Sequence, residues 1–225
     1  MCSLGMLQRI FISLTVVLFL AVSVAAVFQA PAPQPKPAAG DVIKSGPFAG
    51  MVLVTLHEGS NELYLEGNRV LDMVFRAWRE NGNAHGFHLT TFYRHAHYDA
   101  DRFAPASDRW ELIPYFDSNP PKEVDSYRSS MGADCVLEDL FLMRPAPATN
   151  KPTMAVIARR EFGETFVSDM PVSFHIYELK KEPVTLGRPE VFFENVRTAK
   201  SKGKYCDVAD AMNRELGVGP KFQSR

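Results

Sequence analysis

The spacing of hydrophobic residues changes along the chain, and the first long periodic segment predicts a helix. Apolar side chains recur at helical intervals between Asn68, which is suited to cap the start, and Gly82, which is suited to end it. These apolar residues are Val70, Leu71, Val74, Phe75 and Trp78. Ahead of them, the short β-branched run at residues 51–56 predicts a buried strand, and Gly, Ser and Asn at residues 59–61 predict a turn.

Later segments alternate between apolar and polar positions, which is typical of strands with one buried face. In residues 86–94, the odd positions from Phe87 to Tyr93 face one way and the even positions from His88 to Arg94 face the other. Short connections between successive segments predict antiparallel pairing. The predicted strands are residues 86–94, 110–113, 134–143, 153–160, 172–177 and 190–196.

A second helix is predicted from the N-cap Asp207 to Leu216, with Gly217 at its end. Between the two helices, residues 96–130 contain four prolines and many Asp and Ser residues, which predict irregular connections. Aromatic side chains in that region suit either core packing or a surface that binds a sugar or a peptide. They are Phe103, Trp110, Tyr115, Phe116 and Tyr127.

Together these elements predict an α+β fold. It consists of a mainly antiparallel sheet with one or two packed helices, after an N-terminal transmembrane or signal helix. No internal repeat and no phosphate-binding glycine loop is present in the sequence.

The N-terminal segment predicts a membrane location. Residues 10–28 form an apolar run of nineteen residues, interrupted only by Ser and Thr, and a spanning helix needs about 20. Arg9 precedes the run, so the positive-inside rule predicts that residues 1–9 form a short cytoplasmic tail. Residues 29–46 are rich in Pro and Ala and predict a stalk, and residues 47–225 predict a single exported domain.

We therefore expect a single-pass inner-membrane protein whose domain lies in the periplasm or at the cell exterior. The alternative is secretion after cleavage near Ala25 or Ala26, where small residues resemble a signal-peptidase site. An oxidising compartment favours a disulfide between Cys135 and Cys206. The expected partners are the membrane, through residues 10–28, and another envelope protein or a glycan. A net charge of −1 gives no long-range attraction to nucleic acid.

A cluster of histidines suggests one candidate site. His95, His97 and Asp99 stand at alternate positions, and in an extended chain they project to one side. Imidazole and carboxylate groups in this arrangement can hold zinc or a similar divalent metal. The run resembles the His-x-His-x-Asp-His signature of metallo-β-lactamase-like hydrolases, although Ala100 stands where the last histidine belongs. The resemblance implies metal-dependent hydrolysis; otherwise no cofactor is expected.

Two further histidines suggest a second site. His88 precedes Thr90 by two positions on one predicted strand, and His175 precedes Tyr177 by two positions on another. The pattern is similar to the two-histidine phosphoesterases, although Tyr177 replaces the small hydroxyl residue of their second motif. The resemblance implies that one histidine acts as base and the other as acid on a phosphodiester.

Neither candidate site has a complete catalytic set. A membrane-anchored envelope protein whose exported domain is a binding or assembly module is therefore the expected function. The alternative is a hydrolase, either metal-dependent through His95, His97 and Asp99 or phosphodiesterase-like through His88 and His175.

Overall fold

The computed structural model describes residues 42–66, 72–82, 85–96, 109–117, 122–132, 134–147, 149–183 and 187–219. The chain divides into residues 1–38 and residues 39–225, and every described residue belongs to the second unit. The predictions for the tail, the apolar run 10–28, the cleavage sites and most of the stalk therefore lie outside the described residues. Within the described ranges, no helix is long and apolar enough to cross a bilayer.

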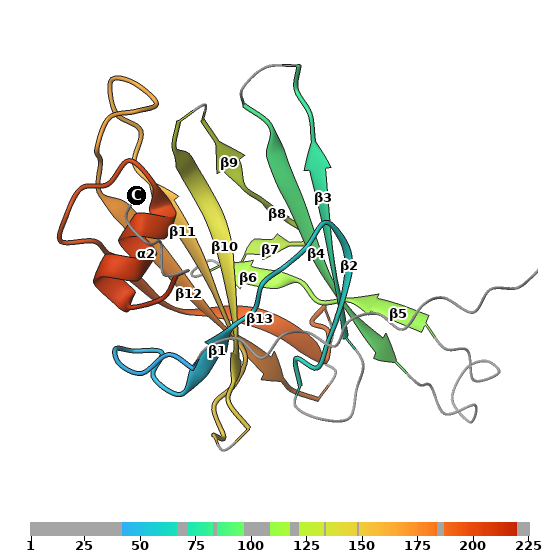
Figure 1. The fold of residues 1–225 in the computed structure, drawn as a ribbon. Coiled ribbons are helices and arrows are strands. Elements are labelled where there is room, and N and C mark those ends of the chain that lie inside the picture. The colour runs from blue at the N-terminus through green and yellow to red at the C-terminus, as the bar shows by residue number, and fades with distance from the viewer. Residues whose placement is uncertain are drawn as a thin grey trace, which may run out of the picture. The chain divides into compact units, whose positions relative to one another are not determined.

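The larger of two sheets, sheet A, has eight strands. They are β1 (Met51–Leu53), β6 (Tyr115–Asp117), β7 (Lys122–Val124), β9 (Ser130–Met131), β10 (Val136–Pro145), β11 (Met154–Arg160), β12 (Val172–Lys181) and β13 (Val191–Lys200). Their order is β1-β10-β11-β12-β13-β6-β7, with β9 also beside β10 (Figure 1). The paired strands are antiparallel apart from β13 and β6, which are parallel.

Sheet B has five strands. They are β2 (Gly59–Leu63), β3 (Asp72–Arg79), β4 (Phe87–Ala96), β5 (Arg109–Leu112) and β8 (Tyr127–Arg128). Their order is β2-β3-β4-β5, and β8 pairs with the other end of β4. The chain passes from sheet B to sheet A at Ser129, between β8 and β9. Ser129 is fully buried, and its backbone N–H donates to the carbonyl of His88 over 2.9 Å.

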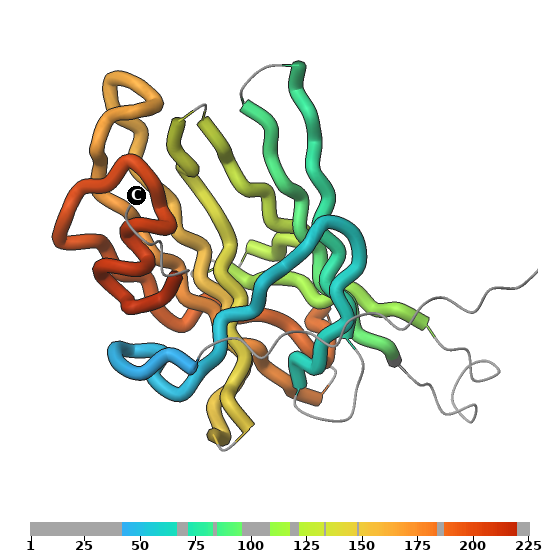
Figure 2. The backbone as a smooth tube through the Cα atoms, viewed as in Figure 1, coloured from blue at the N-terminus to red at the C-terminus, as the bar shows by residue number. Residues whose placement is uncertain are grey.

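One helix, α2 (Val208–Leu216), covers the face of sheet A that points away from sheet B (Figure 2). Asp207 accepts from the backbone N–H of Ala209 and caps the start, and Gly217 ends the helix with a left-handed backbone (φ 68°). Both termini are as the sequence predicts. The helix buries Val208, Ala211 and Met212 against the sheet, and burying a Val or Met side chain stabilises the fold by roughly 1.5–3 kcal/mol.

The domain therefore has three layers and two cores. The first core lies between the sheets and joins Val74 and Phe92 of sheet B to Leu142, Ile157 and Phe193 of sheet A. The second core lies between sheet A and α2. It includes Phe141, Val156, Phe174, Val208 and Met212. Alternation along each strand of sheet A produces this division, because successive side chains enter opposite cores.

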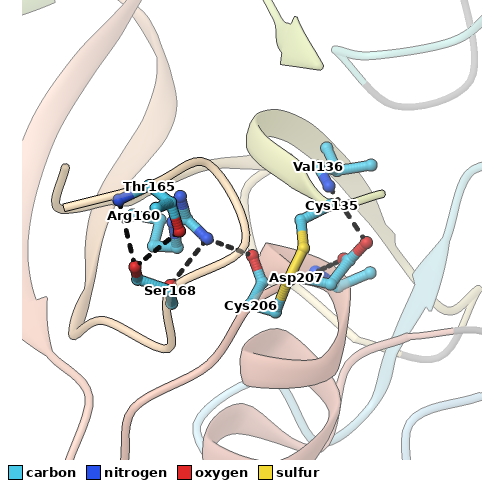
Figure 3. The surroundings of a disulfide bond; sticks show 8 residues. Cys135, Val136, Arg160, Thr165, Ser168, Cys206 and Asp207 are labelled. Atoms are coloured by element: carbon cyan, nitrogen blue, oxygen red, sulfur yellow. Dashed lines mark hydrogen bonds between the residues drawn. A yellow bond between two sulfur atoms is a disulfide. The ribbon is translucent and has the colours of Figure 1, made fainter. Parts of the chain in front are cut away.

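A disulfide ties α2 to sheet A (Figure 3). Cys135 and Cys206 have Cα atoms 5.6 Å apart and are bonded, which confirms the predicted pair. Asp207 adds a second link, because its other carboxylate oxygen accepts from the backbone N–H of Val136 over 3.2 Å. The buried Arg160 donates to the carbonyl of Cys206 over 3.1 Å and so holds the loop before the helix.

The predicted α+β class is wrong. The described residues form a β-rich fold with one α-helix, and the first predicted helix is the strand β3. The spacing of its apolar residues misleads because both faces of β3 carry them. Val74 is fully buried in the first core, whereas Phe75 on the other face is 45% exposed. When both faces of a strand carry apolar side chains, apolar and polar residues no longer alternate along its sequence. The segment is then a strand because it pairs with β2 and β4.

The other predicted elements agree more closely with the structure. Strands β4, β5, β10, β11, β12 and β13 occupy the predicted segments, with ends that differ by a few residues. The strand predicted at 51–56 is shorter, at Met51–Leu53, and the turn predicted at 59–61 is instead the beginning of β2. Within residues 96–130, the described ranges contain short strands where irregular connections are predicted.

Candidate binding pocket

A pocket of about 250 Å³ lies on the sheet-B side of sheet A, at the edge of the first core. Strands β6, β7 and β8 form one wall, and β10, β11 and β12 form the other. The lining residues are Tyr115, Asp117, Val124, Ser126, Tyr127, Arg128, Glu138, Ile157, Arg159 and Tyr177. The pocket combines aromatic, aliphatic and charged side chains, which is a composition typical of sites for small ligands.

An ion pair crosses the sheet wall of the pocket. Glu138 and Arg159 are directly opposite each other on β10 and β11, and an Arg159 Nη2 to Glu138 Oε1 distance of 2.8 Å joins them. Arg159 follows Ile157 by two residues, so the strand period places both on the face that lines the pocket. The hydrogen bond that Arg159 donates to Glu138 is the main cause that raises the pKa of the Arg159 guanidinium.

A second polar contact joins β12 to β6. The hydroxyl of Tyr177 donates to Oδ1 of Asp117 over 3.0 Å. Burial, followed by the nearby Asp117 carboxylate, raises the pKa of Tyr177, so this phenol stays protonated and remains a donor. Among the described residues, no cationic side chain forms an ion pair with Asp117. The carboxylate therefore keeps acceptor positions that no described residue fills.

Two tyrosines in the wall carry unpaired hydroxyls. Tyr115 is 2% exposed and Tyr127 is 5% exposed, and neither hydroxyl has a hydrogen-bond partner among the described residues. Burial raises the pKa of both phenols well above the usual value, so both stay neutral. Both oxygens are enclosed by the protein, with less than 1 Å² of accessible surface each, so these tyrosines line the pocket with their rings.

His175 lies beside this pocket but does not line it. It stands opposite Ile157 on β11, and its Nδ1 atom is 3.4 Å from the Thr198 hydroxyl on β13. Burial is the main cause that lowers the pKa of its imidazole, and Arg159 lowers it further. Tyr177, two residues later, does line the pocket.

The predicted partners of His175 lie on sheet B. The imidazole of His88 is 2.6 Å from Glu58 through Nε2 and 3.1 Å from Arg76 through Nδ1. Thr90 is buried under β8, opposite Tyr127. The two histidines thus belong to different sheets and have different hydrogen-bond partners, whereas a paired acid and base need a common cleft.

Only part of the predicted metal site is described. His95 packs against Trp110 with ring centroids 5.1 Å apart, and His97 and Asp99 lie outside the described residues. Within the described ranges, no three His, Cys, Asp or Glu side chains converge in a way that would hold a metal ion.

Tyr115, Tyr127 and Tyr177 are residues of interest in the sequence, but the four charged residues of the pocket are not predicted from it: Asp117, Arg128, Glu138 and Arg159. Glu138 and Arg159 occupy inward positions of strands that otherwise alternate regularly, and a charge at such a position is a usable signal. Asp117 has no comparable signal, because its strand joins the sheet through a parallel pairing with β13.

Comparison with known proteins gives a fold relationship alone. No family model matches the sequence, and no curated protein sequence matches it. The crystal structure of CarG is similar, with a TM-score of 0.56 and 21% sequence identity over 77% of this chain and 99% of the CarG chain. Nearly all of CarG therefore corresponds to the domain described above.

Proposed function

We propose that this protein is a binding module held at a membrane, and that its domain binds a small organic ligand in the pocket between β6–β8 and β10–β12. The observation that carries the proposal is that Asp117, Glu138 and Arg159 meet tyrosine rings in one pocket wall. Charged side chains at inward positions of a sheet that otherwise encloses an apolar core depart from the pattern that stabilises the fold, and such departures concentrate at functional sites.

The rigidity of the surroundings supports binding. The pocket residues extend from strands whose next inward positions belong to the first core, including Leu140 and Ile157. Side chains fixed in this way lose little freedom when a ligand arrives, so little binding energy is spent on ordering them.

Binding is favoured over catalysis by the state of the pocket carboxylates. Asp117 already accepts from Tyr177, and Glu138 already pairs with Arg159. Among the described residues, Ser126, which lines the pocket, forms no hydrogen bond to a histidine. A nucleophile needs an adjacent base, and the hydrolase interpretation gains no observation here.

The membrane location rests on the apolar run 10–28, and the disulfide supports an oxidising compartment. The predicted anchor should leave the protein in the pellet after alkaline extraction of membranes. Substituting Leu18→Arg in the centre of the run should release it, because a charge at the bilayer centre costs about 3 kcal/mol. N-terminal sequencing of the pelleted protein separates a retained anchor from cleavage near Ala25 or Ala26.

The pocket itself is tested with a set of several hundred small organic compounds in ligand-detected NMR, using the full chain in a detergent that has no sugar head group. Ser126→Trp places an indole in the pocket, and Ser60→Trp, at an exposed position on β2, is the matched control. We expect compounds that bind the wild type and the control but not Ser126→Trp. If every compound that binds does so equally to all three proteins, the pocket is not a ligand site.

A further inference from the structure

We infer that the ligand of this pocket is a neutral molecule rich in hydroxyl groups, of the carbohydrate class. This inference rests on the function proposed above and adds the chemistry of the ligand. It is drawn from the charge, the hydrogen-bonding capacity and the dimensions of the pocket wall.

The charges of the wall cancel. Asp117 and Glu138 carry negative charge, and Arg128 and Arg159 carry positive charge. A ligand with a single charge of either sign therefore meets a like charge as well as an opposite one. It also competes with the existing 2.8 Å pair between Glu138 and Arg159. A neutral ligand keeps that pair intact and avoids the desolvation cost of its own charge.

The wall offers both acceptors and donors at short range. Asp117 uses one acceptor position for Tyr177, and a carboxylate has about four. Ser126 lines the same pocket, is half-buried, and carries a hydroxyl that can both donate and accept. A hydroxyl group donates and accepts at one atom, and neighbouring hydroxyls on one ring match this mixture. An amide separates its donor from its acceptor and has fewer of both.

The remaining surface of the pocket suits the carbon skeleton of a sugar. The rings of the tyrosines and the side chains of Val124 and Ile157 give it apolar faces, against which the C–H groups of a sugar ring can pack. A volume of about 250 Å³ equals the share of about eight water molecules at ~30 Å³ each. This space accommodates a compact ring more readily than an extended peptide.

The test compares ligands of one shape and different charge, with the full chain in a detergent that has no sugar head group. Glucose, glucosamine and glucuronate share a ring and carry zero, positive and negative charge; N-acetylglycine N-methylamide represents a peptide. Affinities are measured by saturation-transfer NMR. We expect glucose or another neutral hexose to bind about tenfold more tightly than either charged analogue, because each charged analogue meets a like charge in the wall.

Pocket variants then establish where binding occurs. Asp117→Asn and Ser126→Ala should each weaken binding of the neutral sugar about tenfold, as expected for loss of one hydrogen bond. The controls are Asp210→Asn, exposed on α2, and Ser60→Ala, exposed on β2; both should bind as the wild type does. Ser126→Ala removes a single oxygen atom, so the test remains valid if Asp117→Asn folds poorly.

The possible outcomes distinguish a failure of the carbohydrate class from a failure of the proposed pocket function. If a charged analogue or the amide binds best and Ser126→Trp abolishes that binding, the pocket function stands and the carbohydrate class is wrong. Sugar binding that neither pocket variant changes also refutes the class, because the sugar then binds elsewhere. If no compound of any kind is sensitive to Ser126→Trp, both the class and the pocket function are wrong.

Discussion

Asp72 lies at the start of β3 with no exposed surface, and its burial makes the stability of the domain depend on pH. One carboxylate oxygen accepts from the backbone N–H of Leu65 over 2.6 Å, and the other has no partner among the described residues. Burial is the main cause that raises the pKa of Asp72 to about 6, and the neighbouring Glu66 raises it further. The protonated carboxyl is therefore the form that the folded state favours.

The size of the effect follows from the two pKa values. A rise from 3.8 to about 6 corresponds to about 3 kcal/mol at ~1.4 kcal/mol per pKa unit. Because the folded state binds the proton more tightly than the unfolded chain, this stabilisation is complete below pH 3.8 and is lost as the pH rises through about 6. The free energy of unfolding should therefore fall by about 3 kcal/mol across this range through Asp72 alone.

Urea denaturation of the wild type and Asp72→Asn, followed by tryptophan fluorescence from pH 3.5 to 7.5 at constant ionic strength, isolates this term. Both proteins share the remaining titrating groups, so the difference between their free energies of unfolding reports Asp72. Relative to the variant, the wild type should lose about 3 kcal/mol between pH 4 and pH 7. Asp210→Asn, at an exposed position on α2, is the control and should show no such trend. A difference that is flat or that grows with pH would refute a raised pKa at Asp72.

Three further changes test other parts of the structure by equilibrium unfolding at pH 7. Tyr127→Phe removes an unpaired buried hydroxyl and should raise the free energy of unfolding by about 1 kcal/mol without ligand. A clear decrease in this free energy would mean that the hydroxyl is paired. The control, Tyr64→Phe, should leave the free energy of unfolding unchanged. Replacing Cys135 and Cys206 together by Ser should lower the free energy of unfolding by about 4 kcal/mol, given a sequence separation of 71 residues; an unchanged value in oxidised protein would contradict the bond. Asp207→Ala removes the helix cap and the acceptor for Val136, so it should lower the free energy by about 2 kcal/mol. Asp207→Asn, which keeps one oxygen, should lower it by less, and equal losses would argue against the capping role.

The parts of the fold that the sequence predicts well are those where local chemistry and tertiary position agree. In α2, Asp207, Gly217 and the apolar spacing all indicate the same nine-residue helix. In β11, both faces are buried from Ala155 to Ala158, and successive side chains enter the two cores in turn, so a short apolar run correctly predicts a strand. β3 fails because its outer face carries Phe75 without burying it, so the apolar pattern no longer distinguishes a strand from a helix.

The pocket could not be assembled from the sequence for a different reason. Glu138 and Arg159 meet because two strands pair in a particular register, and Asp117 meets Tyr177 because β6 runs parallel to β13. The pairing of β6 with β13 joins distant parts of the chain and leaves no mark near Asp117 or Tyr177. The local signs are chemical. They are the charges of Glu138 and Arg159 at inward strand positions, and tyrosines in a region of weak periodicity, for which core packing and ligand binding are alternative explanations.

In the proposed binding module, the position of the pocket separates the ligand contacts from the most apolar part of the first core. On β10, the inward residues change from the apolar Leu142 and Leu140 to Glu138, and on β11 they change from Ala155 and Ile157 to Arg159. The same strands therefore supply a dry core at one end and a polar wall at the other. Substitutions at Glu138 and Arg159 can then alter ligand preference while the core residues continue to fix the strand register. This separation predicts that recognition in domains of this fold can change through the polar ends of the strands while the apolar ends stay constant.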